Sequence, residues 1–180
     1  MRILKEQTAA VVIDIQEKLH PHIHGFETLE KNTAILIQGL QALNVEIVLT
    51  EQYPKGLGRT IEPIRALLPG IRIIEKTAFS CYDEPAFKEK LQLLNKKNII
   101  IAGEETHVCV LQTAVDLLNA GYTPIVVADC VSSRKEFSKE TALRRIEKEG
   151  AVITTYESIL FELCRYAGSE TFKTISKLVK

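Results

Sequence analysis

The sequence predicts an α/β protein: a three-layer doubly wound sandwich built on a six-stranded, mostly parallel sheet. Short runs of β-branched and apolar residues alternate with longer segments in which apolar residues recur at the helical period. Most of the short runs are apolar throughout, as strands covered on both faces of a sheet must be. Strand and helix repeated in this order form right-handed crossovers, which place helices on both faces of the sheet.

Each element follows from its local pattern. The strands are expected at residues 8–13, 45–49, 71–74, 98–102, 124–128 and 151–153. The helices are expected at residues 27–44, 84–95, 107–120, 138–149, 156–166 and 169–179. In the first helix one apolar stripe is made by Leu29, Leu36, Leu40 and Leu43. Gly121 and Gly150 stand where helix C-caps are expected.

Composition narrows the classes of function. The 180 residues are enough for one domain, 1–180, and 46% of them are hydrophobic, so a core can form. The 23 basic and 23 acidic residues cancel, which favours a small-molecule substrate over nucleic acid or an anionic membrane. No apolar run approaches the roughly 18 residues that span a bilayer. Without a cleavable apolar leader or a C-x-x-C pair, we expect a cytoplasmic protein with reduced cysteines.

Three chemically active side chains follow different strands. Asp14, Lys76 and Cys109 come after the first, third and fourth expected strands, and ligands of such folds bind at the carboxyl ends of the strands. With Thr106 as N-cap, Cys109 lies in the first helical turn, where free amides and the helix dipole are expected to lower the pKa of its thiol. Lys76 would keep Asp14 ionised, and Asp14 would take the proton of the thiol.

Other motifs give less information about the function. The turn after the first strand has no glycine-rich pattern and the chain has no phosphate loop, so no nucleotide cofactor is expected. His107 is two residues from Cys109, about 200° away around a helix, and is not expected to be its base. Neighbouring Glu104 and Glu105 project to opposite sides, which excludes paired glycosidase carboxylates.

Alternating histidines at positions 20, 22 and 24 raise the possibility of a metal site. An extended chain would bring all three rings to one side, but the pattern has no clear fourth ligand. We therefore expect a mobile polar loop here and no metal.

Four segments together resemble the isochorismatase-like cysteine hydrolase superfamily, which includes nicotinamidases, N-carbamoylsarcosine amidases and isochorismatases. They are V-V-I-D-I-Q at 11–16, E-K-T-A-F-S at 75–80, G-x-x-T-x-x-C-V at 103–110 and D-C-V-S-S-R at 129–134. The resemblance implies that Asp14, Lys76 and Cys109 form a catalytic triad. It also implies a cis peptide between Glu104 and Glu105, so that the amides of Glu105 and Cys109 face an oxyanion, and assembly as a homo-oligomer.

One segment departs from the nicotinamidase branch of the superfamily. The metal-binding D-x-H of that branch is replaced by E-Q-Y-P-K-G-L-G at 51–58, which removes the metal site and makes nicotinamide a poor candidate substrate. The prediction is a cofactor-free, cysteine-dependent hydrolase of a small amide or related C–N bond, acting through a thioester. The substrate pocket is expected to include Gln16, Tyr53, Phe79 and Ser80.

Two alternatives stay open. In the first, the chain is an isochorismatase-type enol-ether hydrolase in which Asp14 is an acid and Cys109 a spectator. In the second, it is a non-catalytic α/β module that binds a small ligand, such as a flavin, in the same crevice.

Overall fold

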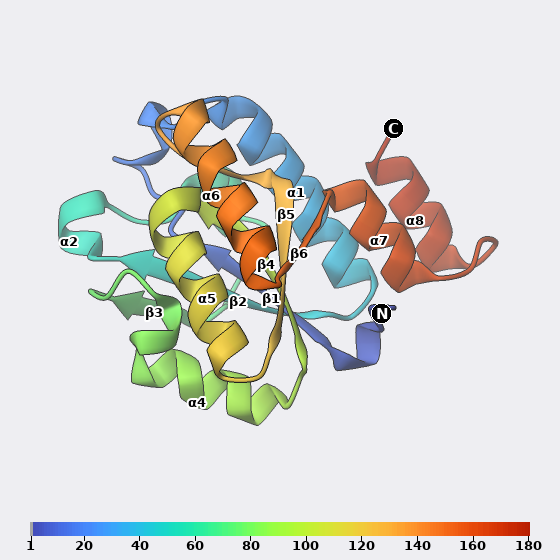
Figure 1. The fold of residues 1–180 in the computed structure, drawn as a ribbon. Helices are drawn as coiled ribbons and strands as arrows, with labels where there is room; N and C mark the ends of the chain where they lie inside the picture. Colours follow the sequence, from blue (N-terminus) through green and yellow to red (C-terminus); the bar gives the residue numbers. More distant parts are fainter. Residues whose placement is uncertain (1) are drawn as a thin grey trace.

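Six strands form one parallel sheet in the computed structural model, which describes residues 2–180 (Figure 1). Their order across the sheet is β3-β2-β1-β4-β5-β6, and every neighbouring pair is parallel. The strands are β1 (Thr8–Ile13), β2 (Glu46–Gln52), β3 (Ile73–Lys76), β4 (Asn98–Glu104), β5 (Thr123–Ser132) and β6 (Val152–Thr154). The predicted α/β fold and its six strands are confirmed, and the sheet is parallel throughout rather than mostly so.

All six expected long helices are present. They are α1 (Phe26–Ala42), α4 (Pro85–Leu94), α5 (Leu111–Asn119), α6 (Glu136–Glu149), α7 (Tyr156–Cys164) and α8 (Glu170–Leu178). The short elements are α2 (Pro54–Leu57), α3 (Glu62–Arg65), the 3₁₀ turns η1 (Lys5–Gln7), η2 (His20–His22) and η3 (Cys81–Asp83), and the π-helical turn η4 (Thr106–Val110). The sequence pattern missed α2 and α3, because four residues are too few to show a helical period. Gly150 ends α6 in a left-handed conformation, as expected of a C-cap.

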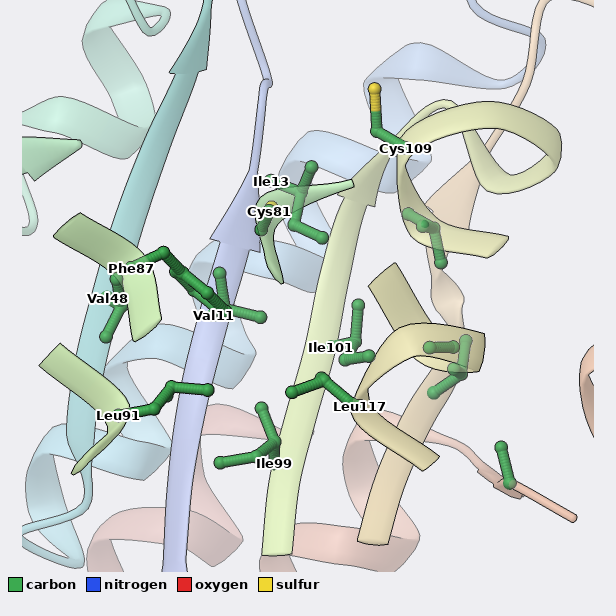
Figure 2. Packing of buried hydrophobic residues seen from close by; sticks show 14 of the residues in the cluster. Val11, Ile13, Val48, Cys81, Phe87, Leu91, Ile99, Ile101, Cys109 and Leu117 are labelled. Atoms are coloured by element: carbon green, nitrogen blue, oxygen red, sulfur yellow. The ribbon is translucent and has the colours of Figure 1, made fainter. Parts of the chain in front are cut away.

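The helices cover both faces of the sheet. Alternate residues of β1 point to opposite sides: Val11 and Ile13 pack in the cluster that α4, α5 and α6 cover, whereas Ala10 packs with α1, α7 and α8. Figure 2 shows the first of these clusters, in which Phe87 and Leu91 of α4 lie against the sheet. Because β1 is buried on both faces, its sequence is apolar from Ala9 to Ile13, and its one polar residue, Thr8, is buried as well.

The strand order places a switch point between β1 and β4. The chain builds β2 and β3 outward on one side of β1 and then crosses to add β4, β5 and β6 on the other side. In folds of this kind, ligands bind where the carboxyl ends of the two central strands part. Here those ends lead to Asp14 and to the segment that carries Cys109.

Gly103 makes the close contact between these two strands possible. It pairs with Ile13 in the sheet and has a φ of 126°, a backbone conformation that side chains disfavour. A Cβ atom added at this position would lie 2.0 Å from the carbonyl oxygen of Ile13. Glycine at position 103 therefore allows the Asp14 turn to lie directly against the Cys109 segment.

None of the helices in residues 2–180 combines the length and the apolar character needed to cross a membrane.

Candidate active site

Asp14, Lys76 and Cys109 meet at the carboxyl edge of the sheet. The Nζ atom of Lys76 lies 2.6 Å from Oδ2 of Asp14, in an ion pair whose side chains are both buried. Cys109 lies close enough to this carboxylate for the two groups to shift each other's pKa. The structure therefore brings together the three residues that the sequence singled out, from three separate strand ends.

The Asp14 carboxylate is held from more than one side. Its residue follows β1 in a left-handed conformation with φ 53°, which aspartate tolerates better than most residues. The Thr50 hydroxyl donates a hydrogen bond of 2.7 Å to Oδ1, and Lys76 occupies Oδ2. Thr50 was not predicted, although its position supplied a signal: it is a polar residue in the buried part of β2, beside Ile13 in the sheet register.

Lys76 is enclosed by acceptors. Besides Asp14, its ammonium donates to Oε1 of Gln52 at 2.7 Å and to the carbonyl oxygens of Ala78 and Phe79 at 3.3 and 3.1 Å. Burial is the largest single effect and lowers the pKa of Lys76, but the charge and hydrogen bond of Asp14, together with the sulfurs of Cys81 and Cys109, outweigh it and the pKa is raised. Lys76 therefore keeps its proton and provides a fixed positive charge beside Asp14.

Cys109 lies in η4, just beyond the end of β4. Figure 2 shows its sulfur pointing away from the packed cluster that contains Ile13 and Ile101. Burial, followed by the negative charge of Asp14, raises the pKa of the thiol, and Lys76 offsets only part of this effect. The prediction that the pKa of Cys109 is lowered is therefore wrong, because a side chain that is only 6% exposed pays for desolvation of its anion.

The expected capping role of Thr106 is also wrong. Thr106 is the first residue of η4 rather than its N-cap, and its buried hydroxyl has no hydrogen-bond partner among residues 2–180. The N-cap position belongs to Glu105, whose side chain makes no capping hydrogen bond. The turn instead closes through the backbone, because the carbonyl oxygen of Glu105 accepts from the amides of Val108 and Val110.

The surroundings of Asp14 make its carboxylate a stronger base than an exposed aspartate. Burial raises the pKa of its carboxyl group, while Lys76 and the hydrogen bond from Thr50 pull that pKa back down. A carboxylate with a raised pKa accepts a proton more readily than an exposed one does. The site thus combines a protonated thiol with a neighbouring carboxylate suited to remove its proton.

The peptide between Glu104 and Glu105 is cis, as the resemblance implied. The two side chains point to different partners: Glu104 contacts His20, whereas Glu105 accepts hydrogen bonds of 3.0 Å from both the backbone N and Nε of Arg134. Among residues 2–180 the backbone N–H of Glu105 has no hydrogen-bond acceptor.

The four expected pocket residues divide into two pairs. Gln16 and Ser80 are buried: Gln16 bonds the backbone of Gln52 and Gly58, and the Ser80 hydroxyl accepts from the amide of Tyr82. Their side chains hold the surrounding loops. Tyr53 and Phe79 are 55% and 53% exposed and keep free surface near the Lys76 side of the site.

A cavity of about 350 Å³ opens beside Tyr53 but is not lined by Phe79. Its lining includes Tyr53, Lys55, Glu75, Lys76 and Glu84, but not Cys109. This cavity borders the ion pair from the outside and does not by itself reach the thiol.

The residues that replace the metal-binding motif serve the fold. Glu51 is buried and accepts hydrogen bonds from the backbone N and the hydroxyl of Thr60, at 2.6 and 2.8 Å. Within residues 2–180, no group of three or more histidine, cysteine or acidic side chains is arranged to hold a metal ion.

The histidine segment is more ordered than expected. His20 begins the 3₁₀ turn η2 and is buried, whereas His22 and His24 are exposed. The backbone of His24 is tied to Ser132 and Ser133 by hydrogen bonds of 2.7 and 3.0 Å. The structure therefore shows a hydrogen-bonded turn with one buried histidine where a polar loop was expected.

Comparison with known proteins decides the family. The profile of the Isochorismatase domain matches residues 8–158, which include all three residues of the site. The chain belongs to the isochorismatase family. Isochorismatase family protein 1B of Dictyostelium discoideum is 39% identical over 99% of this chain and 89% of its own length. Isochorismatase domain-containing protein 2A of Mus musculus is 38% identical over 99% of this chain and 85% of its own length.

Solved structures of isochorismatase-like proteins agree with this fold. The structure of MAR1 ribonuclease from Caenorhabditis elegans is 36% identical and superposes with a TM-score of 0.94, covering 99% of this chain and 92% of that one. The family resemblance drawn from four short segments is therefore confirmed over nearly the whole chain.

Proposed function

We propose that this protein is a cysteine hydrolase that cleaves a small amide or related C–N bond, with Asp14, Lys76 and Cys109 as its catalytic triad. The observation that carries the proposal is the shared carboxylate: Asp14 is paired with Lys76 at 2.6 Å, and it lies close enough to the Cys109 thiol for the two groups to shift each other's pKa. Family membership supports a hydrolase, and the site supplies a nucleophile, a base and a fixed cation.

In the first half of the reaction, Asp14 accepts the thiol proton while the sulfur attacks the substrate carbonyl carbon. The carbonyl π electrons move to oxygen, and the amides of Glu105 and Cys109 stabilise that oxyanion. When the oxyanion collapses, the C–N bond breaks and Asp14 returns the proton to the leaving amine. A thioester on Cys109 and a free amine result.

In the second half, Asp14 takes a proton from water and the hydroxide attacks the thioester. The C–S bond breaks, the acid leaves, and the proton returns to the sulfur. Throughout, Lys76 keeps Asp14 ionised enough to act as the base, which is consistent with the raised pKa of its ammonium. Because the thiol is protonated at rest, proton transfer accompanies attack instead of preceding it.

The exposed faces of Tyr53 and Phe79 are proposed to contact the substrate. Tyr53 lines the cavity that Lys76 also lines, and the backbone of exposed Phe79 contacts the Lys76 ammonium, so a planar or apolar part of a small molecule would find aromatic surface near this end of the triad. A homo-oligomer, a cytoplasmic location and a single domain spanning 1–180 remain predictions from the sequence, the location being consistent with four unpaired cysteines.

The test is a substrate panel measured with wild type and Cys109→Ala. Amides, carbamoyl compounds and isochorismate-like ethers are incubated with each variant, and a single-stranded RNA is added because one solved relative bears the name ribonuclease. We expect turnover of an amide or carbamoyl compound that Cys109→Ala abolishes. Cys164→Ala is the matched control, since Cys164 is partly exposed and lies outside the triad; it should retain full turnover.

Two results would redirect the assignment. Ether cleavage that survives in Cys109→Ala would indicate the enol-ether reaction, with Asp14 as the acid. RNA cleavage as the single activity would place the chain with its ribonuclease-named relative.

A further inference from the structure

A buried pair of side chains outside the triad reaches the segment that carries Cys109. Nδ1 of His20 lies 2.5 Å from Oε1 of Glu104, and the two residues are 84 positions apart in the sequence. Both are buried, at 4% and 0% exposure. A contact this close between η2 and the last residue of β4 fixes one strand end against another part of the fold.

The surroundings of His20 fix its ring. Phe26, the first residue of α1, packs edge-on against the imidazole with 5.4 Å between ring centroids. On the far side of the ring, Nε2 lies 3.5 Å from a carboxylate oxygen of half-buried Glu30. The imidazole is thus held between α1 and the end of β4, and the backbone of its segment is tied to Ser133 through His24.

Glu104 occupies a position from which it can control the oxyanion donor. Its carbonyl carbon is bonded to the nitrogen of Glu105, whose N–H is one of the two donors in the proposed mechanism. The Glu105 side chain is already anchored by Arg134. Only the contact with His20 holds Glu104 by its side chain, because the second carboxylate oxygen has no partner among residues 2–180.

The charges facing Glu104 make its anchorage by His20 necessary. Burial raises the pKa of the Glu104 carboxyl, and the nearby carboxylates of Glu105 and Asp14 raise it further. The close contact with His20 acts in the opposite direction. Without His20, Glu104 would be a buried acid with unpaired oxygens beside two other carboxylates, and its side chain would be driven to move.

We propose that His20 is a positioning residue for the reaction: by hydrogen bonding to Glu104, it holds the Glu105 amide where the oxyanion forms. This inference rests on the proposed function, since it assigns His20 a task only if Cys109 attacks a carbonyl group. It assigns the histidine segment a role in positioning the Glu105 amide, in place of the metal binding that its sequence pattern had raised as a possibility.

If His20 has this role, its replacement should slow one reaction of the Cys109 thiol and leave the rate of another unchanged. Acyl transfer from p-nitrophenyl acetate forms a C–S bond and breaks the ester C–O bond through a tetrahedral oxyanion, releasing p-nitrophenol. Alkylation by iodoacetamide displaces iodide from a saturated carbon and forms no oxyanion. Both need Asp14 to remove the thiol proton, but only acyl transfer needs the Glu105 amide.

The experiment measures both rates in His20→Leu and His20→Asn. Leucine removes the donor, and we expect acyl transfer to Cys109 to fall roughly 30- to 100-fold, in line with the effect of misplacing a catalytic group by about 1 Å. Alkylation of Cys109 should stay within about 2-fold of wild type. Asparagine places an N–H donor near the former Nδ1 atom and should restore acyl transfer to within about 5-fold. His22→Leu is the matched control, because this neighbouring histidine is exposed; it should change neither rate.

Each alternative result has a clear meaning. A parallel fall of acyl transfer and alkylation in His20→Leu would show that His20 only supports the fold, and unchanged acyl transfer would show that it does not position the amide; either overturns the inference. If wild-type Cys109 is alkylated but never acylated, the proposed function itself fails, and the role of His20 fails with it.

Discussion

Replacing Thr50 by valine tests whether the Asp14 carboxylate is tuned by its neighbours. Valine keeps the shape of threonine in a fully buried position and removes the hydroxyl that donates to Oδ1 of Asp14 at 2.7 Å. A hydrogen bond to a charged group contributes roughly 1.5–3 kcal/mol. Its loss falls on the ionised form of Asp14, whose proton affinity should therefore rise by about 10- to 150-fold.

The sign of the pH effect follows from the same contact. Burial already raises the pKa of Asp14, and the Thr50 hydrogen bond is one of the interactions that lower it. Thr50→Val should therefore move the acidic limb of the reaction to higher pH, because more alkaline solution is needed before Asp14 can act as a base.

The assay is the second-order rate of Cys109 alkylation by iodoacetamide across pH 4–9, with the labelled peptide quantified by mass spectrometry. Thr50→Ser is the matched control, since it keeps the hydroxyl and should reproduce the wild-type acidic limb. An acidic limb that is identical in Thr50→Val and wild type would refute the assignment of Asp14 as the base, provided that both proteins unfold at similar temperatures.

Three further predictions concern residues around the site. Gly103→Ala should lower the free energy of unfolding by about 3 kcal/mol or more in urea titrations, because its Cβ would lie 2.0 Å from the Ile13 carbonyl oxygen. Gly121→Ala is the control, since Gly121 has a positive φ but open space around it, and this change should lower the free energy of unfolding clearly less. Equal losses in the two variants would contradict the close contact at Gly103. Burial raises the pKa of Glu104, so the folded protein holds this proton more tightly than the unfolded chain and loses stability as pH rises above about 4.5; Glu104→Gln should flatten the decline that begins there, and an unchanged slope would contradict it. Burial, followed by the charge of Asp14, raises the pKa of Cys81 to about 12, so Cys81 should remain unlabelled by iodoacetamide at pH 8 in the native protein and become labelled in denaturant; native labelling would contradict its burial.

The fold could be predicted because its signals are local. β1 is apolar from Ala9 to Ile13 and was placed to the residue, since the strand is buried along its whole length. The residues that end the parallel strands were also visible, and the topology of such sheets brings their side chains to one edge. This is why Asp14, Lys76 and Cys109 could be found before their distances were known.

The electrostatics of the site could not be predicted in the same way. The pKa of Cys109 depends on how deeply its sulfur is buried and on the proximity of Asp14, and neither is encoded in the local sequence. A helix start alone favours a lowered pKa, but desolvation outweighs the dipole here. The parts that Thr50 and His20 play in the site were missed for a related reason. Thr50 acts through its contact with Asp14 and His20 through its contact with Glu104, and each contact joins distant parts of the chain.

The most direct test of the account is to trap the acyl-enzyme. Wild type and Asp14→Asn are mixed with p-nitrophenyl acetate, quenched in acid, digested and mapped by mass spectrometry. The account predicts an acetyl group on the peptide that contains Cys109 in wild type, and at least about 100-fold slower formation in Asp14→Asn. An acetyl group distributed over Cys81, Cys130 and Cys164, or formed on Cys109 equally fast without the Asp14 carboxylate, would contradict it.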